Sequence, residues 1–195
     1  IGSDDIVGLG TSALEGLTAA GIAVLSTAQL NALTSDQMQS LDSVQLRALT
    51  TTQIGGLASD DLNQLSTSQF AQLTTAQIAG LSSYQLAGLA SDDLGALTSA
   101  QIRAIDTRDL SAFDSADLRA MSSLQLSGLT SVQIGAFDTT DLVGFSTEAL
   151  VGLSSAQLAG FTTGQLAALG SDQWRSLSSS QLRGLTSDQI AGLTT

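Results

Sequence analysis

The chain has 195 residues and a formal net charge of −12, from six basic and eighteen acidic residues, and it contains no His, Cys, Lys or Pro. Without these residue types it cannot form a disulfide, a zinc site of ordinary ligands, a Ser-His-Asp triad or a lysine Schiff base. The acidic balance argues against binding to nucleic acid or to an anionic membrane, and no apolar stretch approaches the ~18 residues of a membrane span.

A repeat of eight residues runs through the whole chain without interruption. We number its positions from a large apolar residue: apolar at 1, Ser, Thr or Asp at 2, Ser or Thr at 3, variable at 4, Gln or Asp at 5, apolar at 6, variable at 7 and small at 8. Position 5 is Gln in fifteen octads and Asp in six, with Ala13, Gly21 and Ala149 as the exceptions. Periodicity of this kind indicates a stacked repeat architecture.

Each octad predicts one short helix whose N-cap residue is position 2. In the octad of residues 33–40, Thr34 and Gln37 have the spacing of a capping box, and Leu33 and Met38 have the spacing of a hydrophobic staple. A helix this short is not stable alone in water, so neighbouring octads must bury positions 1 and 6. We therefore predict an all-α solenoid of short helices, one per octad, with positions 4 and 7 facing solvent. Position 8 is Gly or Ala in nineteen of twenty-four octads, which we attribute to close packing between units.

A β-solenoid with about three octads per coil is the alternative. Thr and Ile suit strands, and position 3 is Ser or Thr in twenty-four of twenty-five copies, with Ala19 as the exception, which capping at position 2 does not explain. Against this fold, positions 1 and 6 are separated by odd numbers of residues, so strict alternation would place them on opposite faces of a strand.

Along the chain, the first three octads depart most from the pattern, at Gly10, Ala19 and Gly21. Three pairs of adjacent aspartates offer the clustered oxygen atoms that a hard cation such as calcium prefers, but none of them lies in a calcium-binding loop pattern. We interpret them as acidic residues at helix N-termini, where they complement the helix dipole. The pairs are Asp4-Asp5, Asp60-Asp61 and Asp92-Asp93.

The aromatic residues fit the octad frame as well. Tyr84 occupies the variable position 4 and is expected on the surface, whereas Trp174 occupies position 6 and is expected in the core. Four phenylalanines occupy position 1 and are also expected in the core: Phe113, Phe137, Phe145 and Phe161. We therefore expect no catalytic, cofactor-binding or metal-binding residue in this chain.

The octad Leu73–Gly80, which reads Leu-Thr-Thr-Ala-Gln-Ile-Ala-Gly, resembles the Ser/Thr-Gln octapeptide repeat arrays of very large secreted or surface proteins of bacteria. The resemblance covers the whole chain, is least close in the first three octads, and comes with no named family. It implies an extracellular, fibre-like or adhesin-stalk role without catalytic residues.

We expect residues 1–195 to form a single continuous octapeptide-repeat array, and to belong to a longer array because the frame opens in register at Ile1 and stops mid-octad at Thr195. The expected function is that of a non-enzymatic structural protein, either the subunit of an extracellular filament or a rod-like spacer of a cell-surface protein. It would associate with itself, without nucleic acid, membrane insertion or a small-molecule substrate. The alternative is a solenoid binding module for a peptide or glycan or, if the fold is β, for ice.

Overall fold

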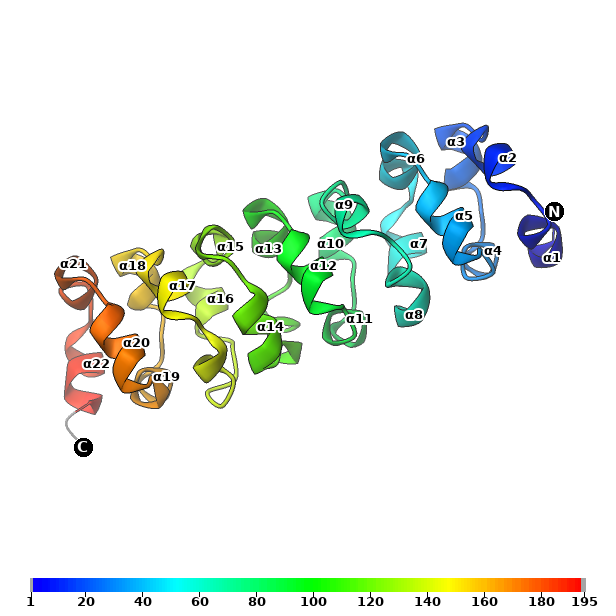
Figure 1. Cartoon of the computed structure of the whole chain (residues 1–195). Helices are drawn as coiled ribbons and strands as arrows, with labels where there is room; N and C mark the ends of the chain where they lie inside the picture. The colour runs from blue at the N-terminus through cyan, green and yellow to red at the C-terminus, as the bar shows by residue number, and fades with distance from the viewer. Residues whose placement is uncertain (1, 194–195) are drawn as a thin grey trace. The chain divides into compact units, whose positions relative to one another are not determined.

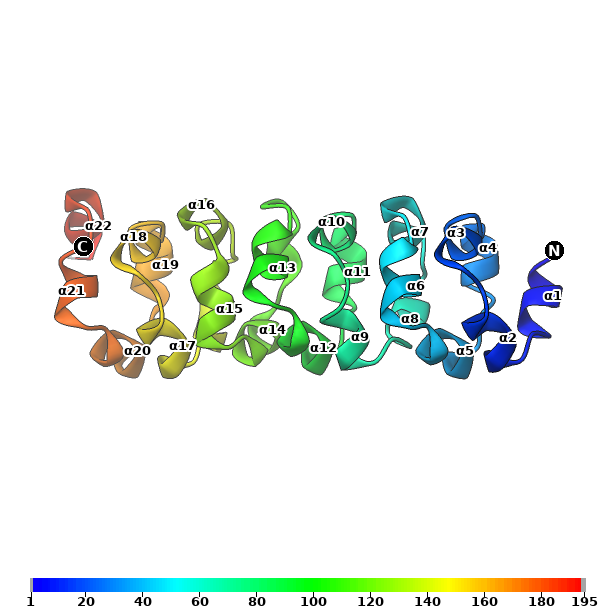
Figure 2. The ribbon, with the colours of Figure 1, turned by 90° about the horizontal axis from the view of Figure 1, so that it is seen from above.

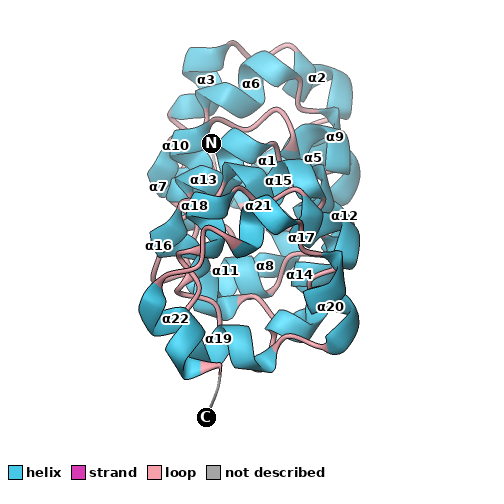
Figure 3. Ribbon diagram, turned by 90° about the vertical axis from the view of Figure 1, so that its left-hand side faces the viewer, coloured by secondary structure: helices cyan, strands magenta, loops and turns pink. Residues whose placement is uncertain are grey.

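The computed structural model describes residues 2–193, and all regular structure among them is helical (Figures 1 and 3). The prediction of an all-α fold with one short helix per octad is confirmed. No strand forms within residues 2–193, so the β-solenoid alternative is wrong, and the ice-binding alternative that required a β face loses its basis. Ile1 and residues 194–195 lie outside the described residues, as does the side chain of Asp4.

The chain divides into two compact units, Ile1–Ala96 and Leu97–Thr195, and each is described by itself. The expectation of a single continuous array stays a prediction. The helices of the first unit are α1 Ser3–Val7, α2 Thr11–Glu15, α3 Ala19–Ala23, α4 Thr27–Leu30, α5 Ser35–Ser40, α6 Ser43–Ala48, α7 Thr51–Gly55, α8 Ser59–Leu62, α9 Thr67–Phe70, α10 Thr75–Ala79, α11 Ser83–Ala87 and α12 Ser91–Ala96.

The second unit contains ten α-helices and two 3₁₀-helices within the part of the chain that the structure describes. They are α13 Ser99–Ala104, η1 Leu110–Ala112, α14 Ser115–Ala120, α15 Ser123–Gly128, α16 Ser131–Ile134, η2 Leu142–Gly144, α17 Thr147–Val151, α18 Ser155–Leu158, α19 Thr163–Ala168, α20 Ser171–Ser176, α21 Ser179–Leu182 and α22 Ser187–Gly192.

The α-helices begin where the capping pattern predicts. At the start of α10, Oγ1 of Thr74 accepts a hydrogen bond from the backbone N–H of Gln77 at 3.2 Å, and Oε1 of Gln77 accepts one from the N–H of Thr74 at 2.8 Å. These two bonds satisfy N–H groups that have no partner within the helix. Where position 2 is Gly10 or Ala58, no side chain caps the helix.

Two octads depart from the predicted helix start. Their first turn is not α-helical, and the regular structure is a 3₁₀-helix that begins at position 6, as η1 and η2. Each has Asp at positions 2 and 5, and Oδ1 of the position 2 residue, Asp106 or Asp138, accepts from the N–H two residues later. Asp114 accepts from the N–H groups two and three residues later, and its helix α14 is α-helical although Asp117 stands at position 5. Residue type alone therefore does not decide between the two forms.

In each unit a helix packs on the helix three octads along the chain (Figures 1 and 2). For example, α2 begins at Thr11 and its neighbour α5 begins at Ser35, 24 residues later. One coil of the solenoid therefore contains three octads. The helix pairs of the first unit with the most extensive contact are α1 with α4, α2 with α5, α3 with α6, α7 with α10, α8 with α11 and α9 with α12. In the second unit, likewise, α15 packs on α13 and on α17, and α18 packs on α16 and on α21.

The core of each coil consists of positions 1 and 6, as predicted. Phe113 and Phe137, which are three octads apart, stack with ring centroids 6.4 Å apart, and Phe145 lies 5.7 Å from Phe137 in an edge-on arrangement. Tyr84 is on the surface, as expected, with 79% of its area exposed. The prediction for Trp174 is wrong, because this side chain is only half-buried. It belongs to the last octads, on whose position 6 no further described coil packs.

Candidate functional site

The glutamines of position 5 join one coil to the next. Nε2 of Gln77 donates to the carbonyl oxygens of Leu46 and Leu49, both at 2.7 Å. These acceptors stand at position 6 four octads earlier and at position 1 three octads earlier, which are separations of 31 and 28 residues. We call the repeated contact the glutamine ladder. Glutamines that make both bonds are Gln37, Gln45, Gln53, Gln69 and Gln85 in the first unit and Gln157, Gln165, Gln173, Gln181 and Gln189 in the second.

Each ladder glutamine serves two helices at once. Its Oε1 accepts the free N–H at the start of its own helix, and its Nε2 donates to two carbonyls at the end of a helix in the preceding coil. For Gln77 these are the carbonyl of Leu49 and the carbonyl of Leu46, which also accepts the N–H of Leu49. Gln77 is buried with both ends of its amide bonded, so it avoids the cost of an unpaired buried polar group. Sequence reasoning found the first role and missed the second.

Aspartate at position 5 lacks the ladder donor and is one methylene shorter. Burial, and secondarily the negative charge of Asp92, raises the pKa of Asp93. The pKa of Asp61 is also raised, by burial and then by Asp60, although a hydrogen bond from Gln64 opposes the shift. The charged forms of these two carboxylates are therefore unfavourable in the folded chain at neutral pH.

Small residues at position 8 allow two coils to approach closely. A Cβ built on Gly160 would lie 2.3 Å from the carbonyl oxygen of Ser131 and 2.6 Å from its Cα. Ser131 stands at position 3 three octads earlier, and Gly88 faces Ser59 in the same way. The predicted close packing is confirmed, and it explains why position 3 stays small as well. No glycine among the described residues has a positive φ, so the exit turn does not depend on a left-handed conformation.

Some side chains at position 7 make a second contact between coils, in the opposite direction along the chain. They donate to the carbonyl oxygen of position 8 in the octad three further on, 25 residues later. Arg47, for example, donates from Nε to the carbonyl of Gln72 at 3.2 Å. The other donors are Asn31, Gln39 and Asn63. Position 7 is therefore at the surface, as predicted, but its longer side chains also brace the next coil.

The ladder is interrupted in the second and third octads, where position 5 is Ala13 and Gly21. Neither side chain has a group to donate. Here the position 1 leucines are only half-buried, whereas Leu33 and those after it are buried up to Leu177. An apolar hollow of about 340 Å³ opens at this place, lined by Ile6, Leu9, Leu17, Gly21, Val24, Leu25 and Gln29.

The last coil exposes a different apolar series. Position 6 is fully buried up to Leu166, but Leu182 is 39% exposed and Ile190 is 52% exposed. Position 6 is thus covered by the following coil, and position 1 mainly by the preceding one.

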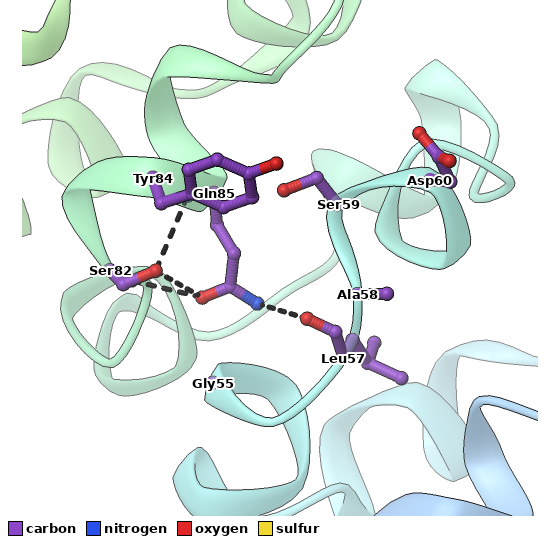
Figure 4. Close-up of a pocket in the computed structure, with 8 residues that line it drawn as sticks. All are labelled: Gly55, Leu57, Ala58, Ser59, Asp60, Ser82, Tyr84 and Gln85. Carbon is purple, nitrogen blue, oxygen red and sulfur yellow. Dashed lines mark hydrogen bonds between the residues drawn. The ribbon is translucent and has the colours of Figure 1, made fainter.

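A surface hollow of about 340 Å³ lies between α8 and α11 in the first unit (Figure 4). Tyr84 lines one side of it, and Ser59 and Asp60 line the other. Gln85 bridges below them with its ladder bond of 2.9 Å to the carbonyl of Leu57. Oγ of Ser59 is buried and has no hydrogen-bond partner within the described residues. The lining thus contains one aromatic ring, one carboxylate and the unbonded hydroxyl of Ser59.

The two acidic pairs whose side chains are both described do not converge into a cation site. Asp92 is exposed while Asp93 is buried, and Asp60 is exposed while Asp61 is half-buried, because positions 4 and 5 face different ways. Within residues 2–193, no group of three or more His, Cys, Asp or Glu residues could hold a metal ion.

The family model described as the ALTTAQ repeat matches the chain five times, at residues 1–35, 54–91, 110–140, 134–171 and 162–195. Together these matches cover well over half of the chain, and parts of the described motif stand at Ala48–Thr51 and Leu73–Gln77. No curated protein matches the sequence. None of the helices described here is long and apolar enough to span a membrane.

Proposed function

Because the chain belongs to the ALTTAQ repeat family, we propose that it is a non-enzymatic structural repeat protein of the cell exterior, either a filament subunit or a rod-like spacer of a surface protein. The observation that carries this proposal is the glutamine ladder. Each ladder glutamine donates to the carbonyls of the same two octad positions, 6 and 1. Octads can therefore be added to or removed from the array without creating a new kind of contact between coils.

The way the polar side chains are used supports a structural role. Position 2 hydroxyls cap helices and position 5 glutamines join coils, as Thr74 and Gln77 do in α10. Side chains held in this way by the frame are not available to move protons or attack a substrate. The net charge of −12 supports extension as well, because like-charge repulsion between rods opposes lateral aggregation, and salt screens it.

Removal of repeats tests this proposal. A variant that lacks the octad Leu73–Gly80 keeps every later octad in frame, whereas a variant that lacks only residues 73–76 places polar positions in the core. We expect the first variant to unfold cooperatively with a modest change in thermal midpoint and to be shorter in small-angle scattering. The second should lose a larger part of its total helical circular dichroism signal, because packing fails around the deletion. Equal damage in both variants would contradict a modular spacer.

A binding module for a peptide or glycan is the second candidate, and the hollow beside Tyr84 is the observation in its favour. Because Tyr84 is the single tyrosine of the chain and is exposed, its tyrosine fluorescence in a Trp174→Phe background would report an occupant. A glycan or peptide that changes this signal in that background, and not when Ser59→Ala is added to it, would support binding. No response to a broad glycan and peptide panel would leave the structural role.

A further inference from the structure

We propose that the hollow between α8 and α11, which we call the Tyr84 hollow, binds the guanidinium group of an arginine side chain on a partner protein. This inference rests on the binding module given above as the second candidate function, and it names the chemistry of the occupant. It is argued from a second hollow with the same repeat frame and different variable side chains.

The repeat frame builds both hollows. In the Tyr84 hollow, the ladder bond from Gln85 to the carbonyl of Leu57 is 2.9 Å long. A hollow of about 470 Å³ in the second unit, which we call the Gln157 hollow, contains the ladder bond from Gln157 to the carbonyl of Leu129, at 2.8 Å. Each of these two residues stands nine octads after its counterpart in the Tyr84 hollow. The hollow is thus a product of the frame, and its chemistry depends on the side chains at the variable positions.

The variable side chains make the Tyr84 hollow acidic and aromatic. Position 4 supplies Asp60 and Tyr84, and both are exposed. At the same two octad positions of the Gln157 hollow stand Val132 and Ala156, and Arg103 lines that hollow as well. None of the described residues that line the Tyr84 hollow is basic. The Tyr84 hollow therefore favours a cation, whereas the Gln157 hollow does not.

The groups of the Tyr84 hollow suit a guanidinium in particular. The ring of Tyr84 forms one side and Asp60 the other (Figure 4). A guanidinium can stack on an aromatic face while its N–H groups donate to a carboxylate, which a compact ammonium does less well. Oγ of Ser59, on the same side as Asp60, is an acceptor that has no donor within the described residues. Ring, carboxylate and hydroxyl together match the flat face and the several N–H donors of arginine.

The charge around the hollow favours the same occupant. The net charge of −12 attracts a basic segment of a partner protein and speeds its association. Asp61 stands next to Asp60, and after burial the charge of Asp60 is the main cause that raises the pKa of Asp61. A bound guanidinium would relieve the repulsion between these two carboxylates. A neutral sugar would not gain this attraction.

A pair of short peptides tests the site on the full chain. The probe is acetyl-Gly-Arg-Gly-amide, and the control peptide has citrulline in place of arginine, which keeps the shape and removes the charge. Nuclear magnetic resonance of the isotope-labelled chain follows the backbone amides of Tyr84 and Gln85. We expect saturable shifts at these amides, with a Kd at least about tenfold lower for the arginine peptide, which corresponds to about 1.4 kcal/mol. High salt should weaken this binding.

Single substitutions assign the binding to the two walls of the hollow. Asp60→Asn should weaken binding of the arginine peptide at least about fivefold. Asp36→Asn removes another exposed carboxylate at the same octad position and should leave binding unchanged. Tyr84→Leu should also weaken binding, whereas Tyr84→Phe keeps the ring and should retain it. Circular dichroism confirms that each variant is folded.

The Gln157 hollow allows a gain-of-function test. The triple variant Arg103→Asn, Val132→Asp, Ala156→Tyr gives it the side chains of the Tyr84 hollow, since Asn31 is the residue that corresponds to Arg103 in the repeat. We expect the arginine peptide to cause saturable shifts at the amide of Gln157 in this variant and none there in the native chain.

Three results would overturn the arginine site. They are equal affinity for the two peptides, equal responses to Asp60→Asn and Asp36→Asn, and no new shifts in the triple variant. Maltohexaose, a neutral oligosaccharide, would also overturn it by binding beside Tyr84 where the arginine peptide does not, and the binding-module candidate would then stand. The deletion of octads tests the spacer function separately, so a failure of the arginine site leaves that function in place.

Discussion

Nε2 of Gln77 lies 2.7 Å from the carbonyl oxygen of Leu46, 31 residues earlier in the chain. The same amide accepts the N–H of Thr74 through Oε1 at 2.8 Å. A side chain that makes both contacts must therefore present an acceptor at one edge and a donor at the other while it remains uncharged. Of the residues that complete a capping box, glutamine alone has both edges, because glutamate has no donor when ionised.

The variant Gln77→Glu should keep the cap and lose the ladder bonds. The carbonyl of Leu49 would lose its ladder donor and that of Leu46 would keep only the N–H of Leu49, both next to a buried carboxylate, so we expect a cost of at least about 2 kcal/mol at pH 7. Burial raises the folded-state pKa of such a carboxyl above its unfolded value, so the protonated form is tolerated better than the charged one. The penalty should then be smallest below the unfolded pKa and should grow as pH rises through the folded pKa.

Urea unfolding of the Gln77→Glu variant and the native chain at several pH values measures this penalty. Gln72→Glu, at a partly exposed position without a ladder bond, is the control, and an equal loss there would contradict the ladder's role.

The variant Asp93→Gln should stabilise the chain by restoring a missing ladder bond. By the separations of 31 and 28 residues, the new amide would reach the carbonyls of Leu62 and Leu65. Burial, and then the charge of Asp92, raises the pKa of Asp93, so its charged form is unfavourable in the folded chain. The native residue is best tolerated below the unfolded pKa, and stability is lost as pH rises through the folded pKa. The gain from Asp93→Gln should therefore be about 1 kcal/mol or more at pH 7 and should shrink as the pH falls. Thermal melts at pH 7 and at an acidic pH below the unfolded pKa test this, with the exposed Asp36→Gln as the control. A gain in stability that did not depend on pH would show that charge is not the cause.

Gly160→Ala and Gly164→Ala should have opposite effects, although the two residues are four apart. The new Cβ of Gly160→Ala would meet backbone atoms of Ser131 and force the coils apart, at a cost of about 1–3 kcal/mol. At Gly164, inside α19, the nearest heavy atom lies 3.9 Å away. There the substitution should be neutral or stabilising by about 0.5–1 kcal/mol, because alanine favours the helix. Chemical denaturation of the two variants decides the point, and a neutral Gly160→Ala would mean that the coils do not touch there.

Core truncation should outweigh the loss of a cap. Leu89 is buried at position 1, so Leu89→Ala should cost about 2–5 kcal/mol. Thr74→Ala removes one N-cap and should cost about 0.5–2 kcal/mol. Both changes can be read from urea midpoints at constant m-value. A larger loss in Thr74→Ala would reveal that position 2 makes contacts beyond its own helix.

Much of this architecture is local and could be predicted from the sequence. Thr34 and Gln37 signal the helix start, and the apolar residues Leu33 and Met38 signal the buried face, because capping and burial act within one octad. The number of octads per coil is not a local property. It depends on which earlier octad a given octad packs against. The contact of Gly160 at position 8 with Ser131 at position 3 three octads earlier sets this number, and it is a tertiary contact.

The ladder itself left a trace in the sequence that capping does not account for. A capping box accepts Glu as readily as Gln, yet no octad has Glu at position 5, although the chain contains Glu15 and Glu148. Asp at position 5 in six octads shows that a donor is not required there, so the fifteen glutamines indicate a preference for a residue that donates as well as accepts. The unpaired Oγ of Ser59 in the hollow left no such trace, because Ser at position 3 is the rule throughout the chain.

The ladder also sets how this chain can fold. Every ladder bond joins residues 28 to 31 apart, so the sequence distance between partners is fixed by the coil and would not grow with the number of repeats. No such bond can form until about four successive octads are ordered together, which makes the first one entropically costly, while each further octad adds its bonds to a surface already in place. A fragment of three octads should therefore have no stable structure. Beyond that nucleus, folding would spread from octad to octad as a zipper does, at a pace independent of the length of the array.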